Sequence, residues 1–434
     1  MSKDNLQHVV IIGAGFGGVA CAKKLAKRKN VRVTLIDKHN HHLFQPLLYQ
    51  VATATLTTAD IARSIRGIFA KQERVNVLYN EVLSIELKEK TLTVASGEVI
   101  SYDAVVIATG ARSSFFGNNH WEDYVHQLKS LNDAMGIRQE VLRNLDLANQ
   151  TDATAQKLLS TVVIIGGGPT GVELAGAFSD LIKRSLKRDF RKFDITKQRI
   201  ILLEGQEKLL GAYAEDHSDY TKNRLVDLGV DVRTATMVED IQEKKVVLKG
   251  GEVIDAGVII WTAGVEASPM LRTLGVDLER GGFVPVEKDL SIPGYSSAFV
   301  IGDSAAIADG EGGILPNVAP VAMQTGEFVA RQISTQSLNS NPEEREEFEY
   351  NDKGKMAIVG KGAAIVQVDK WKFKGWFAWL IWLFIHLIFL VDFRSKVGVL
   401  ISWFWSYMFK QPGSRVYPAS YRSKPKKRED CLGE

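Results

Sequence analysis

The chain has 434 residues, of which 45% are apolar and 24% are charged, and its formal net charge is +3. This is an ordinary globular composition, and the length predicts two or three domains. The two cysteines, Cys21 and Cys431, lie far apart and form no C-x-x-C motif, which excludes a vicinal dithiol redox centre. We expect Cys21 to be a small core residue, and the scarcity of cysteine fits a reducing compartment.

The N-terminal segment has a short apolar stretch and an Ala-Cys-Ala triplet at residues 20–22, like a signal-peptide cleavage site. The residues before the apolar stretch are not basic, however, and the stretch itself belongs to the glycine pattern described next. We therefore expect no signal peptide and catalytic domains that stay in the cytoplasm.

Two ten-residue segments match at seven positions: VVIIGAGFGG at Val9–Gly18 and VVIIGGGPTG at Val162–Gly171. A β-branched apolar run followed by Gly-x-Gly-x-x-Gly predicts a buried strand, a tight turn and a helix whose N-terminus holds a pyrophosphate. The first glycine makes the turn, the second lets the phosphates approach, and the third lets helix and strand pack closely. These six glycines are Gly13, Gly15, Gly18, Gly166, Gly168 and Gly171. Two such units predict two bound dinucleotides, an arrangement suited to passing electrons between them.

Each copy is followed by a second apolar run that ends in an acid, VRVTLID at Asp37 and RIILLE at Glu204. An acid in this position accepts hydrogen bonds from ribose hydroxyls, and we count Lys38 with the first of these sites. Three nearby histidines, His39, His41 and His42, have no cysteine or carboxylate at ligand spacing, so we expect loop histidines and no metal site.

Three later strands also end in residues suited to a nucleotide. Tyr102–Ala111 ends in Thr109-Gly110, and Asp255–Val265 contains Gly264; small residues there let the backbone approach a ligand. Ala298–Ala305 closes on Gly302-Asp303, where an acid is suited to bonding the sugar-like chain of a flavin.

The C-terminal segment is aromatic and apolar. Gly375–Val391 has seventeen residues without a full charge, Val397–Phe409 is a second apolar stretch, and six of the eight tryptophans fall between Trp371 and Trp405. Tryptophan concentrates at membrane interfaces, and seventeen residues is the short limit for a spanning helix, so we expect a helix pair lying in one leaflet. A buried core helix and an oligomer interface remain the alternatives. Gly398, Ser402 and Ser406 predict one small, polar helix face.

From Asp352 onward the chain has 15 lysines and arginines against 6 acids. Basic residues flank both apolar stretches and fill the tail, namely Lys370, Lys372, Lys374, Arg394, Lys396, Lys410 and SKPKKRED. This arrangement favours an anionic lipid surface. We expect no nucleic-acid partner, because the sequence contains no nucleic-acid-binding module.

The order of these motifs resembles that of the two-dinucleotide-binding-domain flavoproteins, and within them the type II NADH dehydrogenases, single-subunit NADH:quinone oxidoreductases. HNHHLFQPLLYQVAT, GPTGVELAGAF, PNVAPVAMQTGEFVA and the aromatic C-terminus carry the resemblance, which covers nearly the whole chain. It implies FAD at the first glycine turn and NADH as substrate at the second. The implied FAD contacts are Gly13, Gly15, Gly18, Asp37, Thr109, Gly110 and Asp303, and the implied NADH contacts are Gly168, Gly171, Glu173, Glu204 and Gly264. An acid at Glu204, with no arginine in the following GQEKLL, favours NADH over NADPH.

Three residues are candidates for the chemistry. Glu173 matches the family glutamate beside the nicotinamide, although a first-turn acid is also favoured by the helix dipole. Gln324 matches one of two quinone-side glutamines, and the alternative is a helix-capping or core amide. Pro320 stands where the family has the other glutamine, which puts quinone preference in doubt. Lys396 follows the turn between the apolar stretches and is suited to a quinone entrance or a lipid headgroup.

The expected fold class is α/β, with two Rossmann-like dinucleotide-binding domains and a C-terminal membrane-associated helical segment. We assign residues 1–113 and 288–349 to a discontinuous FAD domain, 114–287 to an NADH domain and 350–434 to the membrane-anchoring region. The implied enzyme is a peripheral, monotopic NADH:quinone oxidoreductase on the cytoplasmic face of the inner membrane. It reduces a membrane quinone without pumping protons, and the resemblance also allows a homodimer. A different donor, a specialised quinone or a low-turnover FAD redox sensor are the alternatives.

Overall fold

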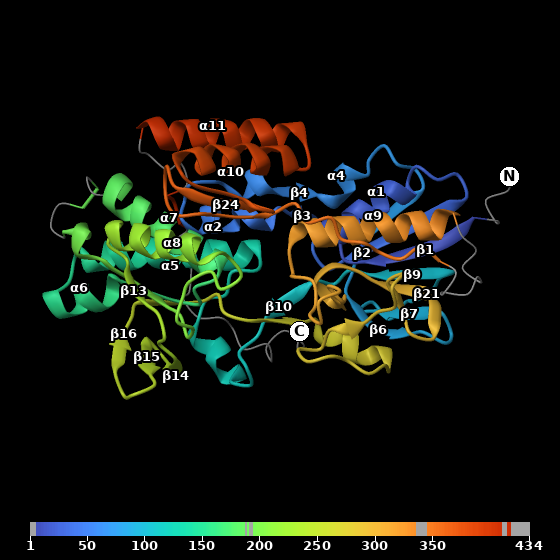
Figure 1. Cartoon of the computed structure of the whole chain (residues 1–434), viewed down its shortest axis with the longest axis horizontal. Coiled ribbons are helices and arrows are strands. Elements are labelled where there is room, and N and C mark those ends of the chain that lie inside the picture. The colour runs from blue at the N-terminus through green and yellow to red at the C-terminus, as the bar shows by residue number, and fades with distance from the viewer. Residues whose placement is uncertain (1–5, 187–188, 191–193, 336–344, 410–414, 418–434) are drawn as a thin grey trace. The chain divides into compact units, whose positions relative to one another are not determined.

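The computed structural model describes residues 6–186, 189–190, 194–335, 345–409 and 415–417 (Figure 1). The chain divides into two compact units. Unit 1 comprises Met1–Leu43, Ala62–Arg112 and Val265–Lys353, and unit 2 comprises Phe44–Ile61, Ser113–Gly264 and Gly354–Glu434. Lys410, Cys431 and the basic tail lie outside the described residues.

Unit 1 is built on a six-stranded sheet with the first apolar run near its centre. The strand order is β20 (Ser291–Ile292), β21 (Tyr295–Val300), β9 (Ala104–Ile107), β1 (Gln7–Ile12), β2 (Val31–Asp37) and β5 (Val75–Tyr79). Neighbours are parallel except β20 and β21. In register, Val9 lies opposite Val33 on one side and Ala104 on the other. The run from Val9 to Ile12 is buried, as expected for a parallel strand covered on both faces.

Helices α1 (Phe16–Leu25) and α9 (Ala319–Thr335) lie side by side in unit 1 (Figure 1). The smaller elements of the unit are β3 (His41–Leu43), β4 (Ala62–Ser64), α4 (Ile65–Ile68), β6 (Val82–Glu86), β7 (Thr91–Val94), β8 (Val99–Ser101), η6 (Pro269–Leu274), β19 (Val284–Pro285), η7 (Gly302–Ser304) and β22 (Ala305–Ala306). The short strands β10 (Ala111–Ser113) and β18 (Val265–Ala267) stand where the chain passes between the units.

Unit 2 contains a four-stranded parallel sheet. Its order is β13 (Asp231–Arg233), β12 (Arg199–Leu203), β11 (Thr161–Ile165) and β17 (Val258–Trp261). The second apolar run thus also forms an inner strand. The surrounding elements are η2 (Gln45–Leu47), α2 (Leu48–Ala52), α3 (Thr58–Ile61), η3 (Asn119–Tyr124), α5 (Leu131–Ala148), α6 (Ala153–Leu159), α7 (Pro169–Asp180), η4 (Leu181–Leu186), η5 (Ile195–Lys197), α8 (Glu215–Asp227), β14 (Val238–Gln242), β15 (Lys245–Leu248) and β16 (Val253–Asp255). Each unit has its own apolar core, so the predicted α/β class with two Rossmann-like sheets is confirmed.

The last part of unit 2 is a small antiparallel sheet followed by two helices. β23 (Lys355–Ile358), β24 (Ala364–Val368) and β25 (Trp371–Gly375) pair in sequence, as the alternating pattern predicted. Helices α10 (Trp376–Phe389) and α11 (Phe393–Phe409) then lie side by side (Figure 1). Among the described residues no helix combines the length and the apolar character needed to cross a bilayer.

The compact units differ from the expected domain boundaries in three segments. Residues 265–287 belong to unit 1, because Leu271, Leu274 and Phe283 are buried in its core. Residues 44–61 belong to unit 2, since α2 packs on α5 and α7 and α3 packs on α11. Residues 354–434 are grouped with unit 2, and a Cβ on Gly176 of α7 would stand 2.6 Å from Gly360 N. The assignment of a cofactor to each unit stays a prediction.

Candidate functional site

The first glycine turn has room for a ligand at one glycine and none at the other two. Gly13 has φ +101°, and a Cβ there would lie 2.2 Å from the carbonyl oxygen of Ala108. A Cβ on Gly18 would lie 1.9 Å from the carbonyl oxygen of Gly13. By contrast, nothing lies within 4 Å of the Cβ position of Gly15. The turn is therefore closed by packing at Gly13 and Gly18 and open at Gly15, as a pyrophosphate cradle requires.

The second turn repeats this geometry in unit 2. Gly166 has φ +113°, and a Cβ there would lie 2.8 Å from Ala263 N. A Cβ on Gly171 would lie 1.9 Å from the carbonyl oxygen of Gly166, whereas Gly168 has nothing within 4 Å. Both turns thus have the shape that the sequence predicted, and each opens onto the N-terminus of a helix, α1 or α7.

An acid holds each turn through the same two contacts. Asp37 Oδ2 accepts from the backbone N–H of Ala14 over 2.6 Å, and its Oδ1 accepts from that of His39 over 2.7 Å. Glu204 Oε2 accepts from the N–H of Gly167 over 2.6 Å, and its Oε1 accepts from that of Gln206 over 2.8 Å. Each carboxylate therefore bridges the glycine turn and the chain two residues beyond itself.

These contacts keep Asp37 ionised. Burial raises its pKa, but the hydrogen bonds from the side chain of His39 and from the N–H groups of Ala14 and His39 outweigh burial, and the pKa lies below its ordinary value. Lys38 points to Glu81, with Nζ 3.6 Å from Oε1. A charged carboxylate at this point accepts hydrogen bonds and donates none, which suits it to sugar hydroxyls.

The other predicted turns of unit 1 meet the first glycine turn at one edge of the sheet. Strands β1, β9 and β21 are parallel neighbours, so their carboxyl ends, which precede Gly13, Thr109 and Gly302, lie together. Thr109 Oγ1 and Ser304 Oγ are 3.0 Å apart, and nothing lies within 4 Å of the Cβ position of Gly110. Asp303 follows Gly302 in the short helix η7. An extended dinucleotide with a polyol chain fits a row of turns of this kind.

Three residues of unit 1 were missed by the sequence analysis. His42 is buried and hydrogen-bonds through Nδ1 to the carbonyl oxygen of Ala14 over 2.8 Å, so it supports the glycine turn instead of lying in an open loop. Gly17 and Gly326 let α1 and α9 approach closely, because a Cβ on Gly326 would stand 2.3 Å from Gly17 O. The additional glycine in GFGG was the available signal.

Glu173 occupies a partly buried position in α7, and its surroundings were not predicted. Its Oε1 accepts a hydrogen bond from the N–H of Ile358 in β23 over 3.3 Å. Burial raises the pKa of Glu173 to about 8, although the N–H of Ile358 and the indole of Trp382 lower it in part. Tyr49 lies beside Trp382, with ring centroids 6.5 Å apart. Glu173 therefore holds a proton at neutral pH, next to aromatic residues from α2 and α10.

Gln324 and Pro320 both lie in the first turns of α9. The side-chain amide of Gln324 donates to the carbonyl oxygen of Asn351 over 2.9 Å and accepts from its N–H over 3.0 Å. One N–H and one lone pair of the amide are left for a ligand. Pro320 is the second residue of α9, where a missing N–H costs no helix hydrogen bond. Lys396 is half-buried in the first turn of α11.

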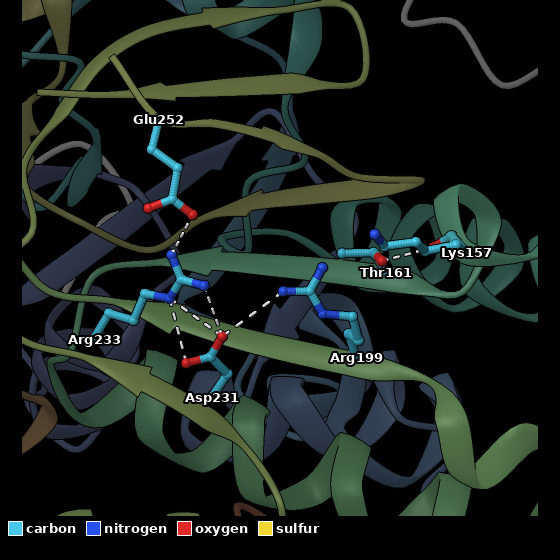
Figure 2. Close-up of polar contacts among 6 residues, drawn as sticks. All are labelled: Lys157, Thr161, Arg199, Asp231, Arg233 and Glu252. Carbon is cyan, nitrogen blue, oxygen red and sulfur yellow. Dashed lines mark hydrogen bonds and ion pairs between the residues drawn. The ribbon is translucent and has the colours of Figure 1, made fainter. Parts of the chain in front are cut away.

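Charges at the end of β13 bear on which nucleotide unit 2 accepts. Arg233 pairs with Asp231 over 2.9 Å and with Glu252 over 2.8 Å, and Arg199 reaches the same Asp231 over 3.9 Å (Figure 2). The hydrogen bonds of Asp231 and Glu252 raise the pKa of Arg233 above its ordinary value. β13 is the neighbour of β12, which leads into Glu204. Two carboxylates already neutralise the guanidinium of Arg233. It is therefore poorly suited to neutralise the 2′-phosphate of NADPH.

The described part of the chain offers no site for a metal ion or a reactive thiol. No cluster of three or more histidine, cysteine or acidic side chains there is suited to a metal ion. Cys21 is buried in α1, and burial raises the pKa of its thiol. A buried thiol of this kind is unreactive.

Comparisons with known proteins agree with this geometry. Residues 7–326 match the family described as pyridine nucleotide-disulphide oxidoreductase. The chain is 39% identical to the type II NADH:quinone oxidoreductase Ndh of Mycobacterium tuberculosis, over 94% of this chain and 89% of the relative. It is 30% identical to a type II NADH:quinone oxidoreductase of Staphylococcus haemolyticus, over 83% and 89% respectively. Among solved structures, NDH2 of Plasmodium falciparum in complex with NADH has a TM-score of 0.85 at 20% identity, over 94% of this chain and 99% of that one, which is a similarity of fold.

The two sheets with their two glycine turns, together with the family match, place the chain in the family described as pyridine nucleotide-disulphide oxidoreductase. Within that class, the chain belongs to the type II NADH:quinone oxidoreductase family. It is an oxidoreductase with FAD as cofactor and NADH as substrate. The open Gly15 with the carboxylate of Asp37, and the open Gly168 with the carboxylate of Glu204, each fit a dinucleotide.

Proposed function

We propose that this enzyme oxidises NADH held by unit 2, binds FAD in unit 1 and delivers two electrons to a membrane quinone. The duplicated acid-held glycine turn is the observation that carries this proposal. FAD, when bound, supplies the hydride acceptor and the two-electron relay. The implied contacts of FAD are Gly13, Gly15, Gly18, Asp37, Lys38, Thr109, Gly110, Gly302 and Asp303, and those of NADH are Gly166, Gly168, Gly171, Glu204 and Gly264.

The protein's own groups orient the reactants and supply protons. Hydride transfer needs no acid or base, but reduction of a quinone consumes two protons. Glu173 is a proton donor matched to neutral pH, because burial raises its pKa to about 8. We assign Gln324 to the quinone side through its remaining amide hydrogen, and Lys396 to the mouth of the quinone path or to a lipid headgroup.

The helix pair α10 and α11 is proposed to lie in one leaflet of the membrane. Trp382 and Trp403 are buried against the rest of unit 2, whereas large apolar side chains on the opposite faces are exposed, among them Phe384, Phe393, Ile401, Phe404, Trp405 and Met408. An apolar face of this extent requires a covering, and tryptophans with flanking cations favour a lipid interface. Of the flanking lysines, Lys372 pairs with Asp216 of α8 over 3.3 Å, and both side chains are exposed.

We propose that the enzyme is peripheral on the cytoplasmic face of the inner membrane and pumps no protons. Helices α10 and α11 contain no carboxylate, and Asp392 lies between them, so the pair carries no chain of acids for proton transfer. Acidification of sealed vesicles during turnover, with no other respiratory enzyme present, would refute this part. A homodimer through the exposed helix faces is the competing use of the same surface, and it predicts a dimer in detergent that does not bind vesicles.

Anaerobic stopped-flow absorption of the purified flavoprotein tests the central proposal. Mixing with NADH should bleach the oxidised flavin band rapidly, NADPH should do so much more slowly, and a soluble quinone should restore the band. Bleaching that quinone fails to reverse would instead indicate a redox sensor. Equal rates with NADH and NADPH would overturn the role given to Glu204.

A further inference from the structure

The strand order of unit 2 separates the two halves of a bound dinucleotide. β12 and β13 extend the sheet on one side of β11, and β17 lies on its other side. The order therefore reverses between β11 and β17, and a dinucleotide crosses the carboxyl ends of the strands at such a point. Glu204 follows β12, so the adenosine half lies on that side. The nicotinamide half then lies over the end of β17, where Gly264 follows.

An aromatic ring covers this end of β17. The Cζ atom of Phe116 lies 2.5 Å from the position that a Cβ on Gly264 would take, and Cε1 and Cε2 lie 3.1 Å from it. Trp261, the last residue of β17, is 6.2 Å from the same ring in an edge-on arrangement. Its Nε1 donates to the carbonyl oxygen of Ser114 over 2.9 Å, which fixes the loop that carries Phe116.

Two features of Phe116 are unfavourable, its exposure and its backbone conformation, and packing in the core explains neither. Its side chain is 66% exposed, and its φ is +53°, a left-handed conformation that is rare for an aromatic residue. The neighbouring Phe115 is buried and packs 5.4 Å from Trp261, so the core contact of this loop is already made. Strain of this kind is typical of ligand-contacting residues held by their surroundings.

We propose that Phe116 packs against the nicotinamide ring of the dinucleotide and thereby determines specificity for that half of the molecule. This inference rests on the proposed binding of NADH by unit 2. Gly264 lacks a side chain and so leaves room for the ring of Phe116 close to the backbone, and a flat heterocycle entering at the end of β17 meets this exposed aromatic ring. Aromatic rings of this kind stabilise one another through offset or edge-on contact.

The test compares two ligands that share the adenosine half. NAD⁺ contains the nicotinamide ring and ADP-ribose lacks it, and calorimetric titration of the oxidised flavoprotein measures both. We expect Phe116→Asn, which suits the left-handed backbone, and Phe116→Leu, which keeps apolar bulk, each to weaken NAD⁺ about three- to tenfold. Both should leave ADP-ribose within about twofold of the native protein, and Phe116→Tyr should retain NAD⁺ affinity. Val226→Ala, at an exposed position of α8, is the matched control and should change neither ligand.

Other results of these titrations would overturn either the inference about Phe116 or the proposed function. Native affinity for NAD⁺ in both Phe116→Asn and Phe116→Leu would overturn the inference, and so would an equal loss for ADP-ribose, which would indicate a structural role. If the native protein bound neither NAD⁺ nor ADP-ribose, the proposed function itself would fail. Flavin content and melting temperature of each variant show whether it is folded, and the Leu variant carries the test if the Asn variant is not.

Discussion

The carboxylate of Glu204 accepts a hydrogen bond from the backbone N–H of Gly167 over 2.6 Å, so the acid after β12 also shapes the glycine turn after β11. Its second oxygen accepts from the N–H of Gln206 over 2.8 Å. The residue therefore holds the turn, and the proposed binding of NADH by unit 2 gives it a second task, accepting hydrogen bonds from the ribose. Replacing it tests both at once.

Glu204→Gln should weaken NADH about tenfold or more. An amide has one acceptor oxygen, so one of the two backbone N–H groups loses its partner, at a cost of about 1–3 kcal/mol. Removing the negative charge should also narrow the preference for NADH over NADPH. The rate of flavin bleaching against nucleotide concentration measures both effects, and the flavin content should stay unchanged. An unaltered preference for NADH would contradict this assignment.

Asp37→Asn should cause loss of flavin. The two contacts that Asp37 makes in unit 1 match those of Glu204, so the same loss of one acceptor distorts the first glycine turn. We expect the affinity for FAD to fall about tenfold or more, from an unmade hydrogen bond worth about 1–3 kcal/mol. The flavin-to-protein ratio after gel filtration is the readout, and Lys288→Met, at an exposed ion pair of the same unit, is the control. Full flavin retention in Asp37→Asn would be inconsistent with FAD at this turn.

Glu173 should make the stability of the enzyme fall as the pH rises. Its pKa is raised from 4.5 to about 8 in the folded protein, chiefly by burial. Between these values the folded state holds the proton and the unfolded chain releases it, so stability falls with rising pH and levels off above about 8. Glu173→Gln should remove this slope and gain about 1–3 kcal/mol at alkaline pH, less than the full shift because the side chain keeps some contact with solvent.

Urea unfolding of the native and Glu173→Gln proteins across this pH range measures the slope directly. Infrared absorption gives an independent readout, because a protonated carboxyl band present at neutral pH should be absent from the variant. Parallel stability curves for the two proteins would show that Glu173 is ionised throughout.

Trp403 should anchor the helix pair to unit 2. Its Nε1 donates to Oε1 of Gln50 in α2 over 2.7 Å, in a buried position. Trp403→Phe removes the donor and leaves a buried acceptor without its partner, so we expect a loss of about 1–3 kcal/mol in the free energy of unfolding. Trp405→Phe, on an exposed side chain of the same helix, should change it by less than about 0.5 kcal/mol. Equal effects of the two substitutions would show that the hydrogen bond is unimportant.

The exposed face of α11 should carry membrane binding. Replacing Phe404 and Met408, which are 60% and 64% exposed, by glutamate removes apolar contact and adds negative charge. We expect the double variant to lose most of its cosedimentation with vesicles of anionic lipid while reducing a soluble quinone normally. Replacing Val226 and Leu147, exposed apolar residues of α8 and α5, by glutamate is the matched control. Native vesicle binding by the Phe404 and Met408 variant would show that this face of α11 does not carry membrane binding.

Much of the binding framework could be predicted from the sequence because it depends on local backbone geometry. A strand, a tight turn and a helix start need a β-branched run and glycines at fixed spacing. The same holds for the acids at the strand ends. It also holds for strands β24 and β25, because the alternation of side chains along a strand can be recognised from neighbouring residues. The small face of α11 was visible too, and Gly398 does meet Asp60 of α3, with a Cβ there 2.9 Å from Oδ1.

Contacts between distant segments were decided only by the tertiary structure. The partners of Glu173 come from β23 and α10, much later in the chain. The packing of those elements buries Glu173, and this burial raises its pKa. Gln324 is engaged by Asn351, and Phe116 meets Gly264, through approaches that no local pattern encodes. Local conformation follows from steric limits on neighbouring residues. Burial and long-range hydrogen bonds depend instead on which distant segments pack together, and this depends on the whole core. That is why the glycine turns could be recognised in the sequence, and the tertiary structure was needed to show what surrounds them.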